Sequence, residues 1–257
     1  MTPLALPLPI WSLLGGVLGA IVGSFIATCI LRWPQGRSAL GGRSACDGCG
    51  KTLDPVELFP LLSILVQRGK CRSCGARIDP LHWRVELACA VAGAILLALM
   101  PDIAGLGSLI LAFFLIPLAI LDWRHFWLPD KLTLPLAFLG LTLGQWVTDI
   151  SLTGRIVGAA GGYLSLLAIS LAYRRLRGRE GLGLGDAKLL GALGAWFGWQ
   201  SLPFLLLIAS ILALLTVAVS AVMHRSVSMT TRIPLGTFLC LAAVPAWLTV
   251  RLMLIPT

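Results

Sequence analysis

The chain has 257 residues, of which 58% are hydrophobic and only 12% are charged, and its mean hydropathy is +0.92. This composition excludes an ordinary soluble protein, because most of the chain must face lipid. The formal net charge of +9 excludes little by itself, but the basic residues are spread over loops that flank apolar segments. That distribution favours contact with the anionic headgroups of a lipid bilayer and argues against nucleic acid as a partner.

Long apolar segments predict an all-α polytopic membrane protein with about eight transmembrane helices, one of them short. The first segment, Ile10 to Leu31, has no lysine or arginine before it and is too long for the core of a cleavable signal peptide, so we expect it to remain as a span. The other predicted spans are Val85 to Met100, Leu106 to Leu121, Leu132 to Val147, Ile156 to Tyr173, the short Leu189 to Phe197, Leu202 to Val222 and Leu235 to Leu254.

Small residues recur in the first span, where Gly15, Gly19 and Gly23 are spaced by four. On a helix this spacing places the glycines on one face and lets the backbone of a neighbouring helix approach closely. We therefore expect these glycines to serve helix packing and not ligand binding.

The segment 32–84 is rich in Gly, Arg, Asp and Cys. It divides the chain into a first transmembrane helix (1–31), a small cytoplasmic loop domain (32–84) and a transmembrane remainder (85–257). The loop contains two CxxC pairs separated by 21 residues, close to the spacing at which two knuckles present four thiolates to one zinc ion. The predicted ligands are Cys46, Cys49, Cys71 and Cys74.

Four protein ligands leave no open coordination position, so we expect the zinc ion to stabilise the loop and not to activate water. A redox dithiol is one alternative. A disulfide pair is the weaker one, because the loop is predicted to lie in the reducing cytoplasm.

Two aspartates lie at the ends of apolar segments, where an ionisable residue is a functional hypothesis by default. Asp122 ends the third predicted span, and Asp186 follows the sequence Gly183-Leu184-Gly185. Each also has a purely structural interpretation. Asp122 could be a helix-end charge paired with Arg124 or Lys131, and Asp186 could be the N-cap of the short helix that follows it.

Basic residues predict the orientation of the chain in the membrane. With 189–197 counted as a span, the segments 32–84, 122–131, 174–188 and 223–232 fall on one side and carry 18 of the 20 Lys and Arg residues. By the positive-inside rule these segments are cytoplasmic and the N-terminus is periplasmic. Both aspartates then lie at the cytoplasmic face of a bacterial inner membrane.

A pair of close carboxylates can hydrolyse a peptide bond without a metal ion. One draws a proton from water, and the other protonates the carbonyl or the leaving amine, with one proton shared between them. Gly183 and Gly185 would let an extended substrate backbone lie against the loop. We expect support for this site from Lys188, Asp130 and Glu86. Asp130 could alternatively cap the next helix, and Glu86 could pair with Arg84.

Two other classes of protein fit parts of this pattern. A proton-coupled transporter also uses buried carboxylates, but it would place them near the bilayer midplane between paired half-helices. A membrane-anchored zinc module that only recruits partners would leave the two aspartates without a function.

The motifs together resemble those of the type IV prepilin peptidases, which are GxGD-type aspartic proteases of the bacterial inner membrane that also methylate their product. Gly23-Ser24-Phe25 followed by Arg32-Trp33-Pro34 is similar to the opening signature of that family, and the CxxC pairs match its zinc loop. Asp122 followed by Leu128-Pro129-Asp130, and Asp186 within Gly183 to Lys188, match the positions of its two catalytic aspartates.

This resemblance implies cleavage of the basic leader of type IV prepilins or type II secretion pseudopilins after a glycine, at the cytoplasmic face. It also implies N-methylation of the new N-terminus with S-adenosylmethionine, although the sequence shows no glycine-rich nucleotide loop. The chain departs from the family pattern at Ala27, where asparagine is frequent, and at Asp47 and Thr237, where proline is common. None of these departures changes either aspartate.

Overall fold

The computed structural model describes residues 7–39, 41, 43–178, 181–223 and 232–251, and in these ranges all regular secondary structure is helical. The chain forms two compact units, Met1–Pro117 and Leu118–Thr257. The boundary between the two units reflects which residues pack together. The three segments predicted from the sequence were instead divided by their amino-acid composition.

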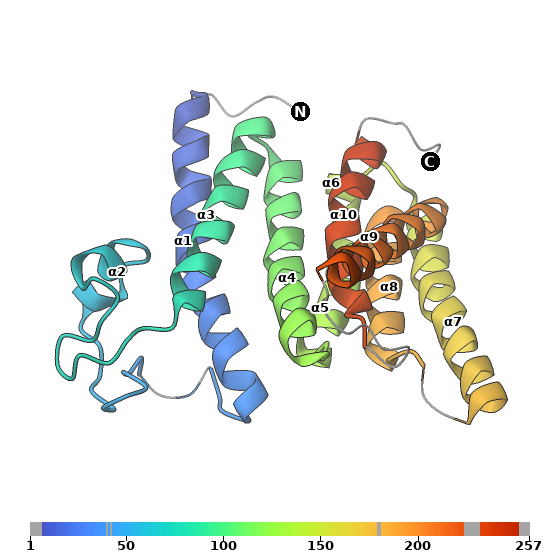
Figure 1. Ribbon diagram of the computed structural model, residues 1–257. Helices are drawn as coiled ribbons and strands as arrows, with labels where there is room; N and C mark the ends of the chain where they lie inside the picture. The colour runs from blue at the N-terminus through green and yellow to red at the C-terminus, as the bar shows by residue number, and fades with distance from the viewer. Residues whose placement is uncertain (1–6, 40, 42, 179–180, 224–231, 252–257) are drawn as a thin grey trace. The chain divides into compact units, whose positions relative to one another are not determined.

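Unit 1 is built on α1 (Leu8–Arg32) and α3 (Pro80–Leu99), which lie side by side (Figure 1). A Cβ atom at Gly15 or Gly19 would collide with the backbone carbonyl of Gly93 or Cys89. The two backbones therefore approach as closely as the glycine spacing predicted. Trp11, Leu97 and Leu109 form a small apolar core beside this contact.

The loop between α1 and α3 carries three short helices and two isolated β-bridges. The helices are η1 (Trp33–Gln35), η2 (Pro55–Leu58) and α2 (Leu62–Val66). The bridges pair Ala45 with Thr52 and Lys70 with Arg77, so each closes a tight turn around one CxxC pair.

Unit 2 contains the end of α4 (Ile103–His125) and the elements that follow it. These are α5 (Asp130–Thr142), α6 (Gly144–Val147), α7 (Leu152–Arg177), α8 (Leu184–Phe197), η3 (Trp199–Ser201), α9 (Leu202–Val222) and α10 (Leu235–Arg251). Helix α8 lies at the centre of this unit, against α5, α7 and α10, and every residue from 189 to 197 is buried.

Arg155 of α7 is fully buried and joins several of these elements through hydrogen bonds. Its guanidinium donates to the carbonyls of Ile150, Thr148 and Gly140 and, at 3.4 Å each, to those of Ala195 and Trp196 near the end of α8. The carbonyls at a helix C-terminus carry partial negative charge, which stabilises a buried cation. Arg155 thereby fixes the end of α8 to α5 and α7.

The helix expected from Leu132 to Val147 is broken, which corrects the sequence prediction. Helix α5 ends at Thr142 and α6 begins at Gly144. Arg155 explains the break, because it takes the carbonyl of Gly140 as a hydrogen-bond acceptor and occupies the space that a side chain at Gly144 would need.

Five helical segments of the described chain are long and apolar enough to cross a membrane: residues 8–35, α3, α4, α7 and residues 199–222. Helix α7, with 26 residues, is about 39 Å long, compared with a hydrocarbon core of about 30 Å. The multi-pass, all-helical class is thus confirmed, and the total of about eight crossings stays a prediction. The last predicted span extends to Leu254, beyond the described residues.

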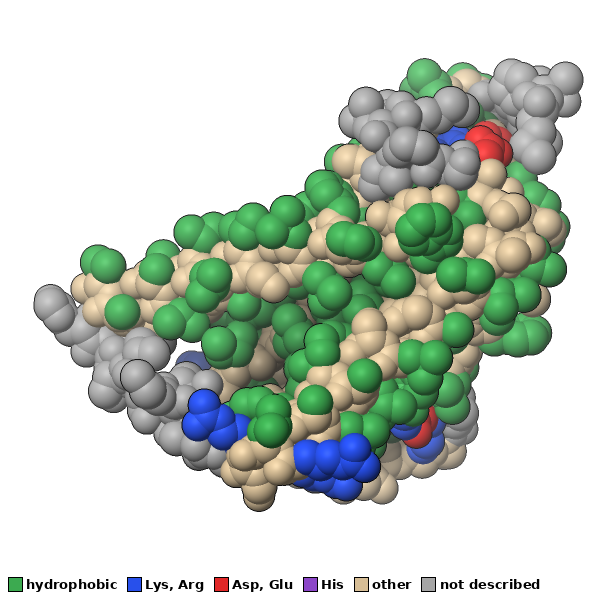
Figure 2. Space-filling view, turned by 90° about the vertical axis from the view of Figure 1, so that its right-hand side faces the viewer, with side chains coloured by type: hydrophobic (Ala, Val, Ile, Leu, Met, Phe, Trp, Pro, Cys, Tyr) green, Lys and Arg blue, Asp and Glu red, His purple; other side chains and the backbone are tan. Residues whose placement is uncertain are grey.

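Large apolar side chains cover the outside of the long helices. Figure 2 shows hydrophobic side chains over most of the face it displays, with Lys and Arg mainly near its lower margin. In unit 2, Leu164 and Ile169 of α7 and Leu207 and Leu214 of α9 are among the exposed ones. Surfaces of this kind are expected where helices contact lipid.

Candidate functional site

Asp122 lies in the last turn of α4, where it is buried and hydrogen-bonded to the start of α10. Its Oδ2 accepts a hydrogen bond of 2.7 Å from the backbone amide of Thr237. The Thr237 hydroxyl lies 3.2 Å from the same oxygen and 3.0 Å from the carbonyl of Ala119, so its single proton serves both acceptors. Thr237 is the third residue of α10, and its amide has no partner within that helix.

Asp186 lies in the first turn of α8 and not before it. The helix begins at Leu184, and the N-cap position is occupied by Gly183. The structure therefore corrects the interpretation of Asp186 as an N-cap. Its Oδ1 is buried and has no hydrogen-bond partner, which is an unusual state for a carboxylate oxygen.

The two carboxylates meet at the N-terminus of α10. The backbone amide of Gly236 favours the ionised form of both Asp122 and Asp186, and the two acids act on one another electrostatically. A Cβ atom at position 236 would lie 3.0 Å from Asp122 Oδ2 and 2.7 Å from Leu128 Cδ1, so only glycine fits there without displacing a neighbour. The positive end of the helix dipole of α10 faces the pair.

Like charges that share one small site are costly when both are ionised. The state of lowest energy holds one proton between the two carboxyl groups, and the pair titrates as a unit. The arrangement therefore supplies one carboxylate and one carboxylic acid at the same place, which are the two groups that metal-free peptide hydrolysis requires.

The glycines before Asp186 occupy different positions from those that the sequence suggested. Gly185 lies inside α8, so the extended loop that was predicted ends at Gly183. A Cβ atom at Gly185 would lie 3.0 Å from Leu128 Cβ. Gly185 thus allows close packing of α8 against the segment that follows α4.

The supporting residues predicted from sequence fall in two places. Lys188 and Asp130 are brought together, with Lys188 Nζ 2.7 and 2.9 Å from the two carboxylate oxygens of Asp130. This partly exposed pair links the first turns of α5 and α8. Glu86 lies in unit 1, where it accepts a hydrogen bond of 2.9 Å from the amide of Leu61. Its possible partner Arg84 instead lies over the ring of Trp83.

Three residues of this cluster were not selected as site residues from the sequence: Leu128, Gly236 and Thr237. Leu128 packs against both Gly185 and Gly236, and the other two contribute backbone amides. The available signal was the sequence Pro234 to Phe238 at the start of the last apolar segment, in which Thr237 was noted as a departure from the pattern of the similar family.

The four loop cysteines form a second cluster, in unit 1. Their sulfur atoms all lie within 4.8 Å of one another, and Cys46 Sγ is 3.8 Å from Cys74 Sγ. Four sulfurs at the usual Zn–S distance of about 2.3 Å would be separated by about 3.8 Å in a tetrahedron. All four thiols are free of disulfide bonds. The cluster can therefore hold a metal ion such as zinc.

The two halves of this cluster have the same local backbone geometry. Cys46 donates its amide proton to the carbonyl of Lys51, and Cys71 donates to that of Ala76. Four residues after each of these cysteines, Gly50 and Gly75 adopt left-handed conformations with φ of 72° and 70°. The backbone amides of Cys74 and Ser73 lower the pKa of the Cys71 thiol to about 7, which favours the thiolate form that binds metal.

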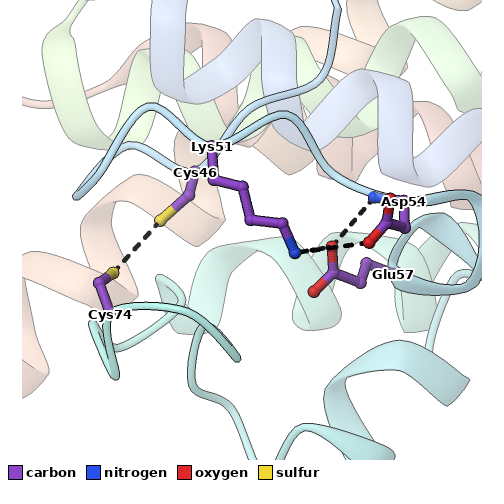
Figure 3. Close-up of polar contacts among 5 residues, drawn as sticks. All are labelled: Cys46, Lys51, Asp54, Glu57 and Cys74. Atoms are coloured by element: carbon purple, nitrogen blue, oxygen red, sulfur yellow. Dashed lines mark hydrogen bonds and ion pairs between the residues drawn. The ribbon is translucent and has the colours of Figure 1, made fainter.

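A buried carboxylate lies close to this cluster. Glu57 Oε2 accepts from the amide of Asp54 at 3.0 Å and lies 3.5 Å from Lys51 Nζ, as Figure 3 shows. Lys51 is also 3.4 Å from Asp54 Oδ2, so both acids engage this lysine. Glu57 Oε1 is buried and has no hydrogen-bond partner.

Glu57 lines a cavity of about 180 Å³ within unit 1. The cavity is enclosed by the cysteine loop together with α1 and α3, and Glu86, Asp79 and His82 also contribute to its walls. Its lining thus places several carboxylates, together with Arg32 and Arg77, around a small space next to the cysteine cluster.

Comparison with known proteins gives consistent matches over both units. Residues 109–218 match the profile of the Type IV leader peptidase family, and residues 17–100 match the Bacterial Peptidase A24 N-terminal domain. No solved structure matches the chain significantly.

Several similar proteins carry the name prepilin leader peptidase/N-methyltransferase. One from Burkholderia pseudomallei is 37% identical over 221 residues, which cover 76% of this chain and 72% of the relative. One from Dickeya chrysanthemi is 38% identical over 243 residues, covering 84% and 85%. One from Pseudomonas aeruginosa is 35% identical over 250 residues, covering 88% and 86%.

Proposed function

Because the chain belongs to the type IV leader peptidase family, we propose that it is a prepilin leader peptidase in which Asp122 and Asp186 form the catalytic pair. The observation that carries this proposal is the arrangement at the N-terminus of α10, where Asp122 accepts a 2.7 Å hydrogen bond from the Thr237 amide and the Gly236 amide acts on both carboxylates. The transporter hypothesis finds no support in the similar proteins, whose name describes a peptidase and methyltransferase.

The pair would act by general acid–base catalysis. The ionised carboxylate takes a proton from water, whose oxygen bonds to the scissile carbonyl carbon, while the protonated carboxyl group gives its proton to the carbonyl oxygen. The tetrahedral diol then returns a proton to the second group, the first passes its proton to the leaving nitrogen, and the C–N bond breaks. Both groups regain their starting states.

The substrates in this proposal are type IV prepilins or type II secretion pseudopilins, cut after their basic leader. The active site faces the cytoplasm of a bacterial inner membrane, because the basic loops that flank the spans are expected on that side. Helix α7 separates a predicted periplasmic end near Ser151 from a cytoplasmic end near Arg177.

The cysteine cluster is proposed to bind one structural zinc ion through Cys46, Cys49, Cys71 and Cys74. Four thiolates complete a tetrahedral shell, so the ion stabilises the fold of the loop and leaves peptide hydrolysis to the aspartates.

N-methylation of the product is the second proposed activity, with S-adenosylmethionine as the methyl donor. This cofactor supplies an electrophilic methyl group on a positively charged sulfur. The cavity of unit 1 is the candidate place for the charged end of such a donor, because its lining includes the carboxylates of Glu57 and Glu86, together with the basic Arg32 and Arg77. Its 180 Å³ is smaller than the roughly 300–1,000 Å³ of sites that enclose a drug-sized ligand, so the rest of the donor would lie outside it.

The zinc proposal predicts that metal content and stability fall together. Purified protein should contain about one zinc per chain, and Cys46→Ser or Cys71→Ser should lower both zinc content and the melting temperature, because metal-binding energy contributes to folding in so small a loop. Metal analysis and thermal unfolding give the two readouts. Cys29→Ala, within α1, is the control and should keep its zinc. Full metal retention in the Cys46→Ser/Cys71→Ser double variant would contradict the proposal.

The proposed orientation predicts opposite accessibility at the two ends of α7. Cysteines introduced as Ser151→Cys and Arg177→Cys are treated with a membrane-impermeant thiol reagent in intact spheroplasts, and peptide mass spectrometry locates the label. The cysteine at 151 should be labelled, and the one at 177 should react only after lysis. Strong labelling at 177 in intact spheroplasts would overturn the orientation and the cytoplasmic position of the aspartates.

The methyl-donor proposal predicts that Glu57→Gln weakens donor binding without loss of leader cleavage. A hydrogen bond to a charged group contributes about 1.5–3 kcal/mol, so the dissociation constant for S-adenosylmethionine in equilibrium dialysis should rise about tenfold or more. Asp54→Asn is the matched control, since this exposed acid contacts the same lysine but does not line the cavity. Equal affinity in Glu57→Gln and wild type would place the donor elsewhere.

The catalytic proposal predicts that Asp122→Asn and Asp186→Asn each reduce leader cleavage by at least about 1,000-fold, because each removes an exchangeable proton while keeping the size of the side chain. The double variant should be scarcely worse than either single one. Asp130→Asn and Glu86→Gln should retain turnover. Cleavage is measured on a prepilin in detergent, with folding checked by circular dichroism. Substantial activity in either Asp→Asn single variant would show that the aspartate concerned is not a catalyst.

A further inference from the structure

The two carboxyl groups of the pair have unequal surroundings. Asp122 Oδ2 accepts the 2.7 Å hydrogen bond from the Thr237 amide and lies within reach of the Thr237 hydroxyl, in addition to the Gly236 amide that both acids share. Asp186 is also stabilised in its ionised form by the backbone amides of Gly236 and Gly183, but its Oδ1 is buried without a donor. Hydrogen-bond donors stabilise an ionised carboxylate. A buried carboxyl oxygen that has no hydrogen-bond donor is, by contrast, a favourable place for a proton.

We propose that Thr237 is a positioning residue that keeps Asp122 ionised and directs the shared proton to Asp186. Asp122 is then the base that draws a proton from water, and Asp186 is the acid that protonates the scissile carbonyl. This inference rests on the proposed function of the pair. It adds which of the two aspartates is the base and which is the acid.

Other charged groups do not provide this asymmetry. Lys188 is held by Asp130, and Arg251 donates to the carbonyl of Val147 at the far end of α10. Cys240 of α10 is buried and interacts with both acids. On α4 itself, Arg124 and His125 are exposed. The donors that contact Asp122 and are specific to it are thus those of Thr237.

Proline is the one residue that has no amide proton to donate. Threonine therefore supplies Asp122 with a backbone donor that proline lacks. The first turn of a helix tolerates proline, because amides there have no partner within the helix, so a Thr237→Pro variant is expected to fold.

A graded series of variants tests the proposal through the pH dependence of leader cleavage. Thr237→Ser keeps both donors, Thr237→Val removes the hydroxyl, and Thr237→Pro removes the hydroxyl and the amide proton. Because catalysis needs ionised Asp122, loss of donors should move the acidic limb of the kcat/KM profile to higher pH, by about one unit for proline and less for valine. The serine variant should match wild type. At pH values on the acidic limb, kcat of the proline variant should fall about tenfold while KM stays unchanged.

The matched control is Thr249→Val on the same helix, where the hydroxyl donates to the carbonyl of Ala246 and not to the pair. Its profile should not move. A folded Thr237→Pro variant with the wild-type profile would overturn the inference. If that variant does not fold, Thr237→Val decides, because an unchanged acidic limb counts against the proposal and a shift to higher pH supports it.

Failure of this inference is distinct from failure of the proposed function. If Asp122→Asn and Asp186→Asn are inactive and the Thr237 variants behave as wild type, the pair is catalytic, but Thr237 does not determine which aspartate holds the shared proton. If Asp122→Asn is active, Asp122 is not a catalyst, and the inference fails with it.

Discussion

Two like-charged carboxyl groups held in one small site at a membrane face are the constraint to which the surrounding structure responds. Burial and mutual repulsion both oppose their ionisation. The N-terminus of α10 offsets this cost, since its unpaired amides at Gly236 and Thr237 point to the acids. Such close contact leaves no room for a side chain at position 236, and Leu128 fills the adjoining space between Gly236 and Gly185. The two glycines, Leu128 and the two acids are thus packed together in one cluster.

A site of this kind needs a rigid support, and α8 supplies it. Asp186 stands in the first turn of a helix whose residues 189–197 are all buried, and Arg155 fixes the opposite end of that helix through the carbonyls of Ala195 and Trp196. On α4, Trp123 next to Asp122 packs edge-on against Phe238 of α10, with ring centroids 6.3 Å apart. Each carboxylate therefore sits on an element whose position is determined by packing, which limits reorganisation during the reaction.

The two proposed activities draw on different chemistry within one chain. Peptide hydrolysis by paired acids needs no cofactor, so unit 2 can carry it with its own side chains. Methyl transfer needs a cationic donor, and in unit 1 the cavity beside the cysteine cluster has carboxylates in its lining, together with Arg32 and Arg77. The same composition that makes the loop too polar to form a large core also makes it suitable for a charged ligand. A metal ion can compensate for the missing core.

The side chains of the candidate sites were visible in the sequence, and the backbone groups around them were not. The cysteine spacing led to a cluster whose sulfurs lie within 4.8 Å, and charge counting selected the two aspartates that the fold joins through Gly236. The break after Thr142 and the early start of α8 at Leu184 were missed, because both lie where tertiary contacts are made, by Arg155 with Gly140 and by Leu128 with Gly185, and hydropathy does not record such contacts.

Thr237 illustrates the same limit most clearly. In the sequence it is one departure from a familiar pattern, at a position where neither a catalytic nor a metal-binding side chain was expected. Its importance depends on an amide proton, which every residue except proline has, and on the position of that amide opposite Asp122. A substitution that leaves both proposed catalytic side chains unchanged is therefore expected to alter which of them holds the proton, because the helix end that faces a carboxylate pair contributes to its electrostatics along with the acids themselves.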